Sequence, residues 1–128
     1  MNLLLDTCTF LWIISGDKAL SKTASGLYAD PSNRVFLSSV SSWEISIKYA
    51  LGRLRLPRPP AQYIPAQREA HGIESFALEE DAAVHLPKLP DYHRDPFDRM
   101  LICQAQFHGL AILTPDELIL RYPVRCTW

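Results

Sequence analysis

The chain has 128 residues, of which 48% are hydrophobic and 21% are charged, and its formal net charge is -1. This length suits one domain with a sizeable core, so we expect a single domain over residues 1–128, and apolar runs far shorter than roughly 20 residues exclude a membrane span. A nearly neutral charge also excludes strong non-specific attraction of the whole surface to polyanions, so any contact with nucleic acid must be local.

Short apolar runs recur along the chain and predict buried strands. Residues 2–5 form the first run, which ends at Asp6-Thr7 in the manner of a central parallel strand. The run has neither the basic start nor the apolar length of a secretory signal, so we expect a strand there. Further strands are predicted at residues 34–38, 73–76, 111–114 and 124–128.

The segments between these runs carry helical spacing of apolar residues and helix-ending signals. Helices are predicted at residues 10–14, 21–30, 41–51, 61–71, 79–86 and 96–108, with a last short helix from residue 115. Asp95-Pro96 opens the strongest of them, in which Phe97, Leu101 and Ala105 form an apolar stripe. Strands that alternate with helices predict an α/β fold, a three-layer α/β/α domain around a central, mainly parallel sheet of four to five strands.

A basic segment follows the helix that is predicted to start at Ser41 or Ser42. That helix would place Trp43, Ile47 and Ala50 on one face. The basic residues of the segment are Lys48, Arg53, Arg55 and Arg58. Their alternation with apolar residues predicts either an ordinary solvated face with an apolar underside or a local contact with RNA, for which the first three are the candidates.

Three cysteines, Cys8, Cys103 and Cys126, form no C-x-x-C pair and are odd in number. This argues against both a disulfide framework and a thiolate zinc site, and it predicts a reducing, cytoplasmic setting. Cys8 lies near no histidine in the sequence and is surrounded by core-like residues. We therefore expect it to be a small buried hydrophobic residue and not a nucleophile.

Four acidic residues stand where a strand-like run gives way to a helix-like one: Asp6, Glu44, Asp98 and Asp116. Taken singly, each has a local explanation as a helix cap, a first-turn acid or, for Ser41-x-x-Glu44, half of a capping box. Taken together they share one edge of the predicted sheet, because the carboxyl ends of parallel strands meet there. Residues from both ends of the chain would then form one acidic cluster.

Such a cluster predicts a divalent cation. Carboxylates held close together repel one another, and a shared proton or a bound metal must relieve that repulsion. Oxygen ligands select hard cations, so Mg²⁺ or Mn²⁺ is expected and zinc is disfavoured. One such ion, or two ions roughly 4 Å apart, would favour hydrolysis of a phosphodiester. His93, alone in a loop rich in Pro and Asp, is expected to be solvent-exposed or a local hydrogen-bond donor and not a ligand.

Four blocks of sequence together resemble the PIN-domain family, in particular the VapC-type ribonuclease toxins of type II toxin-antitoxin systems. The blocks are L-L-D-T at 4–7, S-V-S-S-W-E-I at 39–45 followed by Lys48, H-R-D-P-F-D-R-M-L at 93–101, and L-T-P-D at 113–116. They cover essentially the whole chain in order. The resemblance implies an endoribonuclease toxin that depends on Mg²⁺ or Mn²⁺, cleaves RNA and is neutralised by a cognate antitoxin. It also implies a homodimer and a larger toxin-antitoxin complex.

The resemblance further implies roles for individual residues. The catalytic and metal-binding quartet would be Asp6, Glu44, Asp98 and Asp116. Asp98 is preferred to Asp95 because it precedes the M-L-I-x-x-A helix as the family acid does, which leaves Asp95 as a helix cap or an alternative ligand. Thr7 and Thr114 would hydrogen-bond to the carboxylates or to metal-bound water, and Arg99 would pair with an acid or a phosphate. Residues 10–13 and 49–56 would supply the groove and dimer surfaces.

Three other functions place an acid after the first strand. A haloacid-dehalogenase-like phosphatase needs a second acid two residues later, where this chain has Cys8. A flavodoxin-like or receiver-like module that binds metal or phosphate normally carries an acidic pair ahead of the first-strand aspartate, and nothing acidic precedes Asp6. A catalytically silent PIN domain that only binds partners would not need to keep all four acids.

Overall fold

The computed structural model describes all residues from Met1 to Trp128, and its five strands form one parallel sheet. The strands are β1 (Asn2–Leu5), β2 (Arg34–Ser38), β3 (Glu74–Phe76), β4 (Ala111–Leu113) and β5 (Cys126–Thr127), in the order β3-β2-β1-β4-β5. β1 is central, with Leu4 opposite Phe36 of β2 on one side and Ile112 of β4 on the other. The strand order therefore reverses at β1, and the carboxyl ends of β1 and β4 flank the position where open parallel sheets bind ligands.

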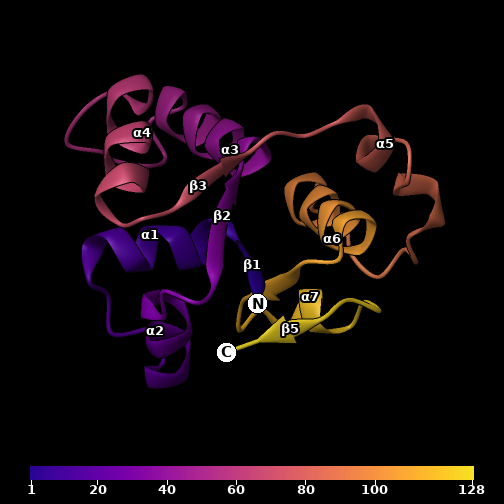
Figure 1. Ribbon diagram of the computed structural model, residues 1–128. Coiled ribbons are helices and arrows are strands. Elements are labelled where there is room, and N and C mark those ends of the chain that lie inside the picture. The colour runs from indigo at the N-terminus through magenta and orange to yellow at the C-terminus, as the bar shows by residue number, and fades with distance from the viewer.

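Seven helices and one short 3₁₀ helix surround the sheet. They are α1 (Thr7–Ser15), α2 (Lys22–Ala29), α3 (Ser39–Ala50), α4 (Pro60–Ala70), α5 (Glu80–Ala83), η1 (Leu86–Lys88), α6 (Pro96–His108) and α7 (Glu117–Leu120). Figure 1 shows α1, α2 and α4 on one side of the sheet and α6 on the other. The predicted three-layer α/β/α architecture is confirmed, and the sheet has five strands that are all parallel.

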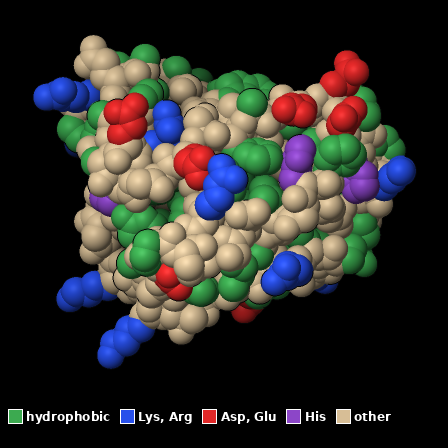
Figure 2. Space-filling view, viewed as in Figure 1, with side chains coloured by type: hydrophobic (Ala, Val, Ile, Leu, Met, Phe, Trp, Pro, Cys, Tyr) green, Lys and Arg blue, Asp and Glu red, His purple; other side chains and the backbone are tan.

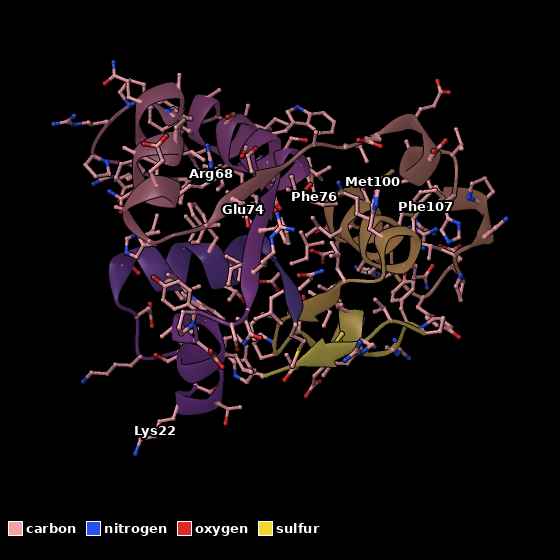
Figure 3. The ribbon with its side chains drawn as sticks, in the orientation of Figure 1. Lys22, Arg68, Glu74, Phe76, Met100 and Phe107 are labelled. Carbon is pink, nitrogen blue, oxygen red and sulfur yellow. The ribbon has the colours of Figure 1, made fainter.

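Two apolar cores lie on the two faces of the sheet because neighbouring residues of a strand point to opposite sides. Leu3 and Leu5 belong to the core beneath α1, α2 and α4. Leu4, between them, belongs to the core beneath α6 and α7. At the edge of the sheet, Phe76 of β3 packs toward α6, with its ring centroid 5.0 Å from that of His108 (Figure 3).

The start of α3 differs from the prediction. Ser38 is its N-cap, and the Ser38 hydroxyl accepts the N–H of Val40 at 3.0 Å, so the helix begins at Ser39 and not at Ser41 or Ser42. The predicted capping box is therefore wrong, and Glu44 lies within the helix. Trp43, Ile47 and Ala50 do share a face of α3, but this face is not the buried one, because Trp43 is 61% exposed. The residues of α3 that are buried are Val40, Ser41, Glu44 and Ile45.

Two other helices also differ from the prediction. α1 begins at Thr7, earlier than predicted, because Asp6 caps it. The single helix predicted at 79–86 is divided into α5 and η1, since Val84 and His85 end the first turn before Pro87 enters the second. α6 has the predicted bounds.

None of the helices combines the length and the apolar character that crossing a bilayer requires. Figure 2 shows the face on which β1 begins, and its acidic and basic side chains are scattered and not gathered into one patch. This face therefore offers no strong electrostatic attraction to a polyanion.

Candidate active site

Asp6 occupies the carboxyl end of the central strand. One carboxylate oxygen accepts the backbone N–H of Thr9 at 2.8 Å and so caps α1. The other oxygen accepts the hydroxyl of Thr114 at 2.5 Å. Only 5% of Asp6 is exposed, and burial raises the pKa of its carboxyl although these hydrogen bonds oppose the shift. Capping and membership of a buried acidic site are thus combined in one residue.

Thr114 joins the end of β4 to this site. Its fully buried hydroxyl donates to Asp6 and accepts the backbone N–H of Asp116 at 3.0 Å. Asp116 is partly exposed and caps α7, since its carboxylate accepts the N–H of Leu118 at 2.9 Å. One threonine therefore fixes the relative positions of two acids that are far apart in the sequence.

Glu44 enters the site from the buried face of α3. Its Oε1 accepts the Thr7 hydroxyl and its Oε2 accepts the Lys48 ammonium, each at 2.6 Å. Glu44 is 6% exposed, so the pairing with Lys48 one turn later compensates a charge that burial would otherwise make costly. The hydrogen bond to Glu44 raises the pKa of Lys48, which keeps the ammonium charged.

The N-terminus of α6 supplies two further acids. Asp95 is the N-cap, and its Oδ1 accepts the N–H groups of Phe97 at 2.9 Å and Asp98 at 3.0 Å. The pKa of Asp98 is raised to about 7, first by burial and then by the carboxylates of Asp95, Asp116 and Asp6. The dependence of one group on the three others indicates that the acids from β1, β4 and α6 act within one electrostatic field.

The exposed residue Cys8 lies beside this cluster, so the predicted burial of Cys8 is wrong. Partial desolvation and the charges of Asp6 and Glu44 raise the pKa of the Cys8 thiol. A raised pKa disfavours the thiolate and therefore argues against Cys8 as a nucleophile or a metal ligand.

His93 and Arg99 lie beneath Asp98. The side chain of His93 is 9% exposed and its Nε2 lies 3.3 Å from Asp98 Oδ2. Of the two roles expected for this histidine, solvent exposure is therefore wrong, and a local hydrogen bond is found. Arg99 donates to the carbonyl of Pro90 at 2.8 Å and to the hydroxyl of Tyr122 at 3.0 Å. Its nearest ion pair is with Asp91 and not with the four acids, so Arg99 anchors the loop before α6.

Sequence reasoning missed the contact between His93 and Asp98. The H-R-D-P-F-D-R block placed the histidine five residues before the acid, but the partner that orients the ring, Tyr122, comes from a different part of the chain. No local pattern marks that pairing.

The donor set of the acidic cluster suits a hard cation. Four carboxylates and two threonine hydroxyls are oxygen donors. Burial and then the neighbouring carboxylates raise the pKa of Asp98, so its charged form is disfavoured, and a bound cation would offset both effects. No three of the His, Cys, Asp and Glu side chains converge closely enough in this arrangement to hold a metal ion already. The side chains would therefore have to turn toward an ion on binding.

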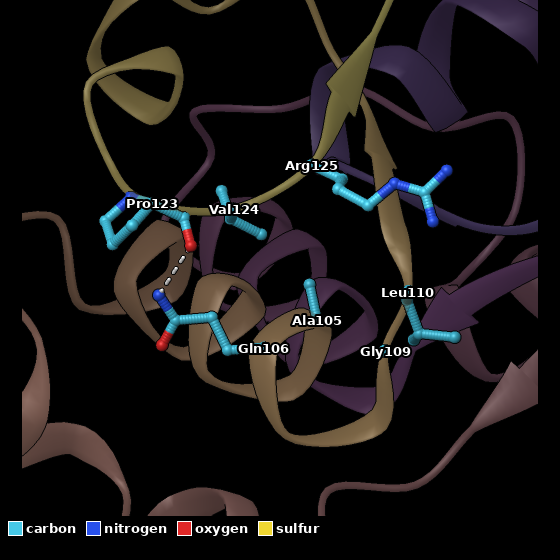
Figure 4. Close-up of a pocket in the computed structure, with 7 residues that line it drawn as sticks. All are labelled: Ala105, Gln106, Gly109, Leu110, Pro123, Val124 and Arg125. Carbon is cyan, nitrogen blue, oxygen red and sulfur yellow. Dashed lines mark hydrogen bonds between the residues drawn. The ribbon is translucent and has the colours of Figure 1, made fainter.

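Several hollows, two of which flank α1 and β5, lie outside the acidic cluster. The first, of about 270 Å³, is lined by residues of α1 and of the segment after α3, including Leu11, Trp12, Leu54 and Leu56. Phe10 and Ile13 of the same helix belong to the core and do not line it. The second, of about 360 Å³, lies where β4 and β5 begin, and Gln106 donates to the carbonyl of Pro123 across it (Figure 4). The second hollow contains none of the four acids.

A profile of the PIN domain family matches residues 3–124. The chain belongs to the PIN domain family. Membership removes the dehalogenase-like and receiver-like alternatives. Over 56 residues this PIN domain is 36% identical to Ribonuclease VapC16 of Mycobacterium tuberculosis (strain ATCC 25618 / H37Rv). That match covers 44% of the chain and 40% of the relative, so the chain matches less than half of that ribonuclease.

Solved structures share the fold of this PIN domain over nearly its whole length. The complex of VapBC2 from Rickettsia felis with a DNA fragment from their promoter contains a chain that matches with a TM-score of 0.72 and 12% identity, covering 99% of this chain and 98% of that one. The DNA-bound VapBC of Salmonella typhimurium matches with a TM-score of 0.70 and 18% identity, covering 99% and 97%. At these identities the similarity shows the fold alone.

Proposed function

We propose that this PIN domain is a ribonuclease toxin that hydrolyses RNA phosphodiester bonds with the help of Mg²⁺ or Mn²⁺. The observation that carries the proposal is the acidic cluster itself, in which burial and, after it, the neighbouring carboxylates raise the pKa of Asp98 to about 7. A cluster of this kind is costly without a cation and has no evident structural purpose beyond the helix caps. The 36% identity to a ribonuclease over part of the chain supports the same reaction.

The residues that would hold the cation are Asp6, Glu44, Asp98 and Asp116. When bound there, such an ion supplies an activated water and neutralises charge that develops on the scissile phosphate. Thr114 donates a hydrogen bond to one carboxylate oxygen of Asp6, and Thr7 donates one to a carboxylate oxygen of Glu44. These hydrogen bonds limit the rotation of the two carboxylates. Lys48 offsets the charge of Glu44 and so reduces the repulsion that an approaching RNA phosphate would meet. Arg53 and Arg55 are exposed after α3 and would contact phosphates further along the strand.

We also infer that a cognate antitoxin silences this toxin. The solved relatives are complexes named VapBC, and the hollow beside α1 has the apolar lining that a partner segment would cover. Leu11, Trp12, Leu54 and Leu56 would contact that segment. A homodimer, a larger toxin-antitoxin complex, a cytoplasmic location and a single domain over residues 1–128 complete the proposal.

The experiment is RNA cleavage by the purified protein, with Mg²⁺, with Mn²⁺ and with a chelator. Asp6→Asn and Asp98→Asn should each lower the cleavage rate by at least about a hundredfold, because each removes one carboxylate from the cation site. Asp81→Asn, on the exposed first turn of α5, is the matched control and should cleave as the unmodified protein does. Cleavage that persists with the chelator, or in both cluster variants, would refute the proposal.

A further inference from the structure

Tyr122 connects two parts of the loop and helix that carry Asp98. It is 3% exposed and follows α7. Its hydroxyl accepts the backbone N–H of His93 at 3.2 Å and the guanidinium of Arg99 at 3.0 Å. The same hydroxyl lies 2.8 Å from Nδ1 of the His93 ring. Three contacts therefore meet at one oxygen.

These contacts assign the proton on His93. A tyrosine hydroxyl has one proton to donate and two lone pairs, and in this network the N–H of His93 and the guanidinium of Arg99 occupy the two lone pairs. The hydroxyl proton must then point at Nδ1, which accepts it. In the neutral ring the remaining proton is on Nε2, and Nε2 faces Asp98 Oδ2 at 3.3 Å. His93 is thus oriented as a donor to Asp98.

The same arrangement recurs at the other buried acids of the cluster. Asp6 receives a hydroxyl from Thr114 on one oxygen, and Glu44 receives a hydroxyl from Thr7. Asp98 has no threonine beside it, and His93 is the side chain that donates to its carboxylate. At each acid a neutral side-chain donor holds one carboxylate oxygen. The second oxygen of Asp6 accepts the backbone N–H of Thr9, and that of Glu44 accepts the Lys48 ammonium. The Asp98 carboxylate accepts from His93 alone, so its orientation depends on that one contact.

We propose that His93 is a positioning residue that, held by the Tyr122 hydroxyl, fixes the Asp98 carboxylate for cation binding. The inference rests on the proposed function, since it assigns Asp98 to a cation site. His93 itself does not contact the cation or the RNA. Hydrogen-bond partners that orient ligating groups typically change metal affinity by about 10- to 100-fold when they are replaced.

The test is Mn²⁺ affinity, measured by calorimetry on the whole protein, together with kcat and KM for RNA cleavage. His93→Ala should weaken Mn²⁺ binding by roughly tenfold or more, with the loss in kcat at limiting Mn²⁺ and little change in KM for RNA. His93→Gln should recover most of the affinity, because the glutamine amide places an N–H near the position of Nε2. Tyr122→Phe should cause a smaller loss, since it keeps the ring and removes only the hydroxyl that orients His93.

His71→Ala, a histidine beyond the C-terminus of α4, is the matched control and should bind Mn²⁺ as the unmodified protein does. If His93→Ala does not fold, His93→Gln and Tyr122→Phe still decide the matter. Unchanged Mn²⁺ affinity in His93→Ala would overturn the inference. So would unchanged affinity in Tyr122→Phe together with a loss of roughly tenfold or more in His93→Gln, or an unmodified protein that binds no Mn²⁺. If Mn²⁺ binding depends on His93 as expected but the protein cleaves no RNA, the proposed function is refuted and the inference about His93 stands.

Discussion

Individual residues of this PIN domain serve as helix caps and as members of the acidic cluster at the same time. Asp6 caps α1 and accepts Thr114, and Asp116 caps α7 within the electrostatic field of Asp98. The two roles are compatible because the N-terminus of a helix carries positive partial charge that favours an anion. Local sequence leaves open whether such an acid is a cap or a functional residue. Asp6 and Asp116 can therefore have both roles at once.

Asp95 and Asp98 are adjacent acids for which the two roles separate. Asp95→Asn should keep both the cap, because asparagine is an equally good N-cap, and most of the RNA cleavage. Asp98→Asn should lose the cleavage, because Asp98 is the acid whose pKa responds to the rest of the cluster. The measurement is the initial rate of RNA cleavage at saturating Mg²⁺. The opposite ranking of the two variants would make Asp95 the ligand.

At the scale of the elements, buried polar contacts hold α3 and α6 against the sheet. Ser38, at the end of β2, donates its hydroxyl to Gln104 of α6 and accepts the backbone N–H of Val40 in the first turn of α3. Both side chains are fully buried. Glu44 and Asp98 extend from these two helices, so this contact sets the spacing between the acids that α3 and α6 contribute.

Ser38→Ala should therefore destabilise the protein by about 2 kcal/mol, since it removes an N-cap and leaves the buried amide of Gln104 without one partner. Chemical denaturation followed by circular dichroism measures the change in the free energy of unfolding. Ser32→Ala, in an exposed turn, is the control and should cost well under half as much. Equal effects of the two substitutions would show that the contact between β2 and α6 contributes nothing.

At the scale of the whole molecule, the acidic cluster lowers stability when no cation is bound. The pKa of Asp98 is raised from 3.8 to about 7, and burial raises that of Asp6 as well. An acid whose pKa is higher in the folded state than in the unfolded state binds its proton more tightly when folded. Folding is therefore favoured at low pH, and the advantage is lost as the pH rises from about 4 through 7.

The unfolding temperature of the metal-free protein should thus decrease as the pH is raised from 5 to 8, once the contribution of the other carboxyl groups to the pH dependence is subtracted. Asp98→Asn should flatten this dependence, because the amide has no proton to release, and saturating Mg²⁺ should reduce it in the unmodified protein. Thermal unfolding in a chelator at several pH values is the measurement. A dependence of equal slope in Asp98→Asn would exclude Asp98 as its source.

Much of the fold follows from local pattern. Residues 2–5 and 34–38 were predicted as strands and 96–108 as a helix with their observed bounds, because the spacing of apolar residues and the caps act over a few positions. The predicted start of α3 is wrong because local pattern leaves a choice: Ser38, Ser41 and Ser42 are all acceptable N-caps in sequence. Ser38 is the one whose hydroxyl caps the helix, and the same hydroxyl donates to Gln104 of α6.

The sequence by itself determined that Asp6 and Asp116 follow buried strands, and it named Glu44 and Asp98, which lie on α3 and α6, as the acids that could join them at one edge. Only the tertiary structure decided what each acid contacts: Thr114 on Asp6, Lys48 on Glu44, and His93 on Asp98. The pairing of His93 with Tyr122 and the exposure of Cys8 depend on the order of strands and the packing of helices. Those are set by long-range burial of apolar surface, which a local pattern does not record.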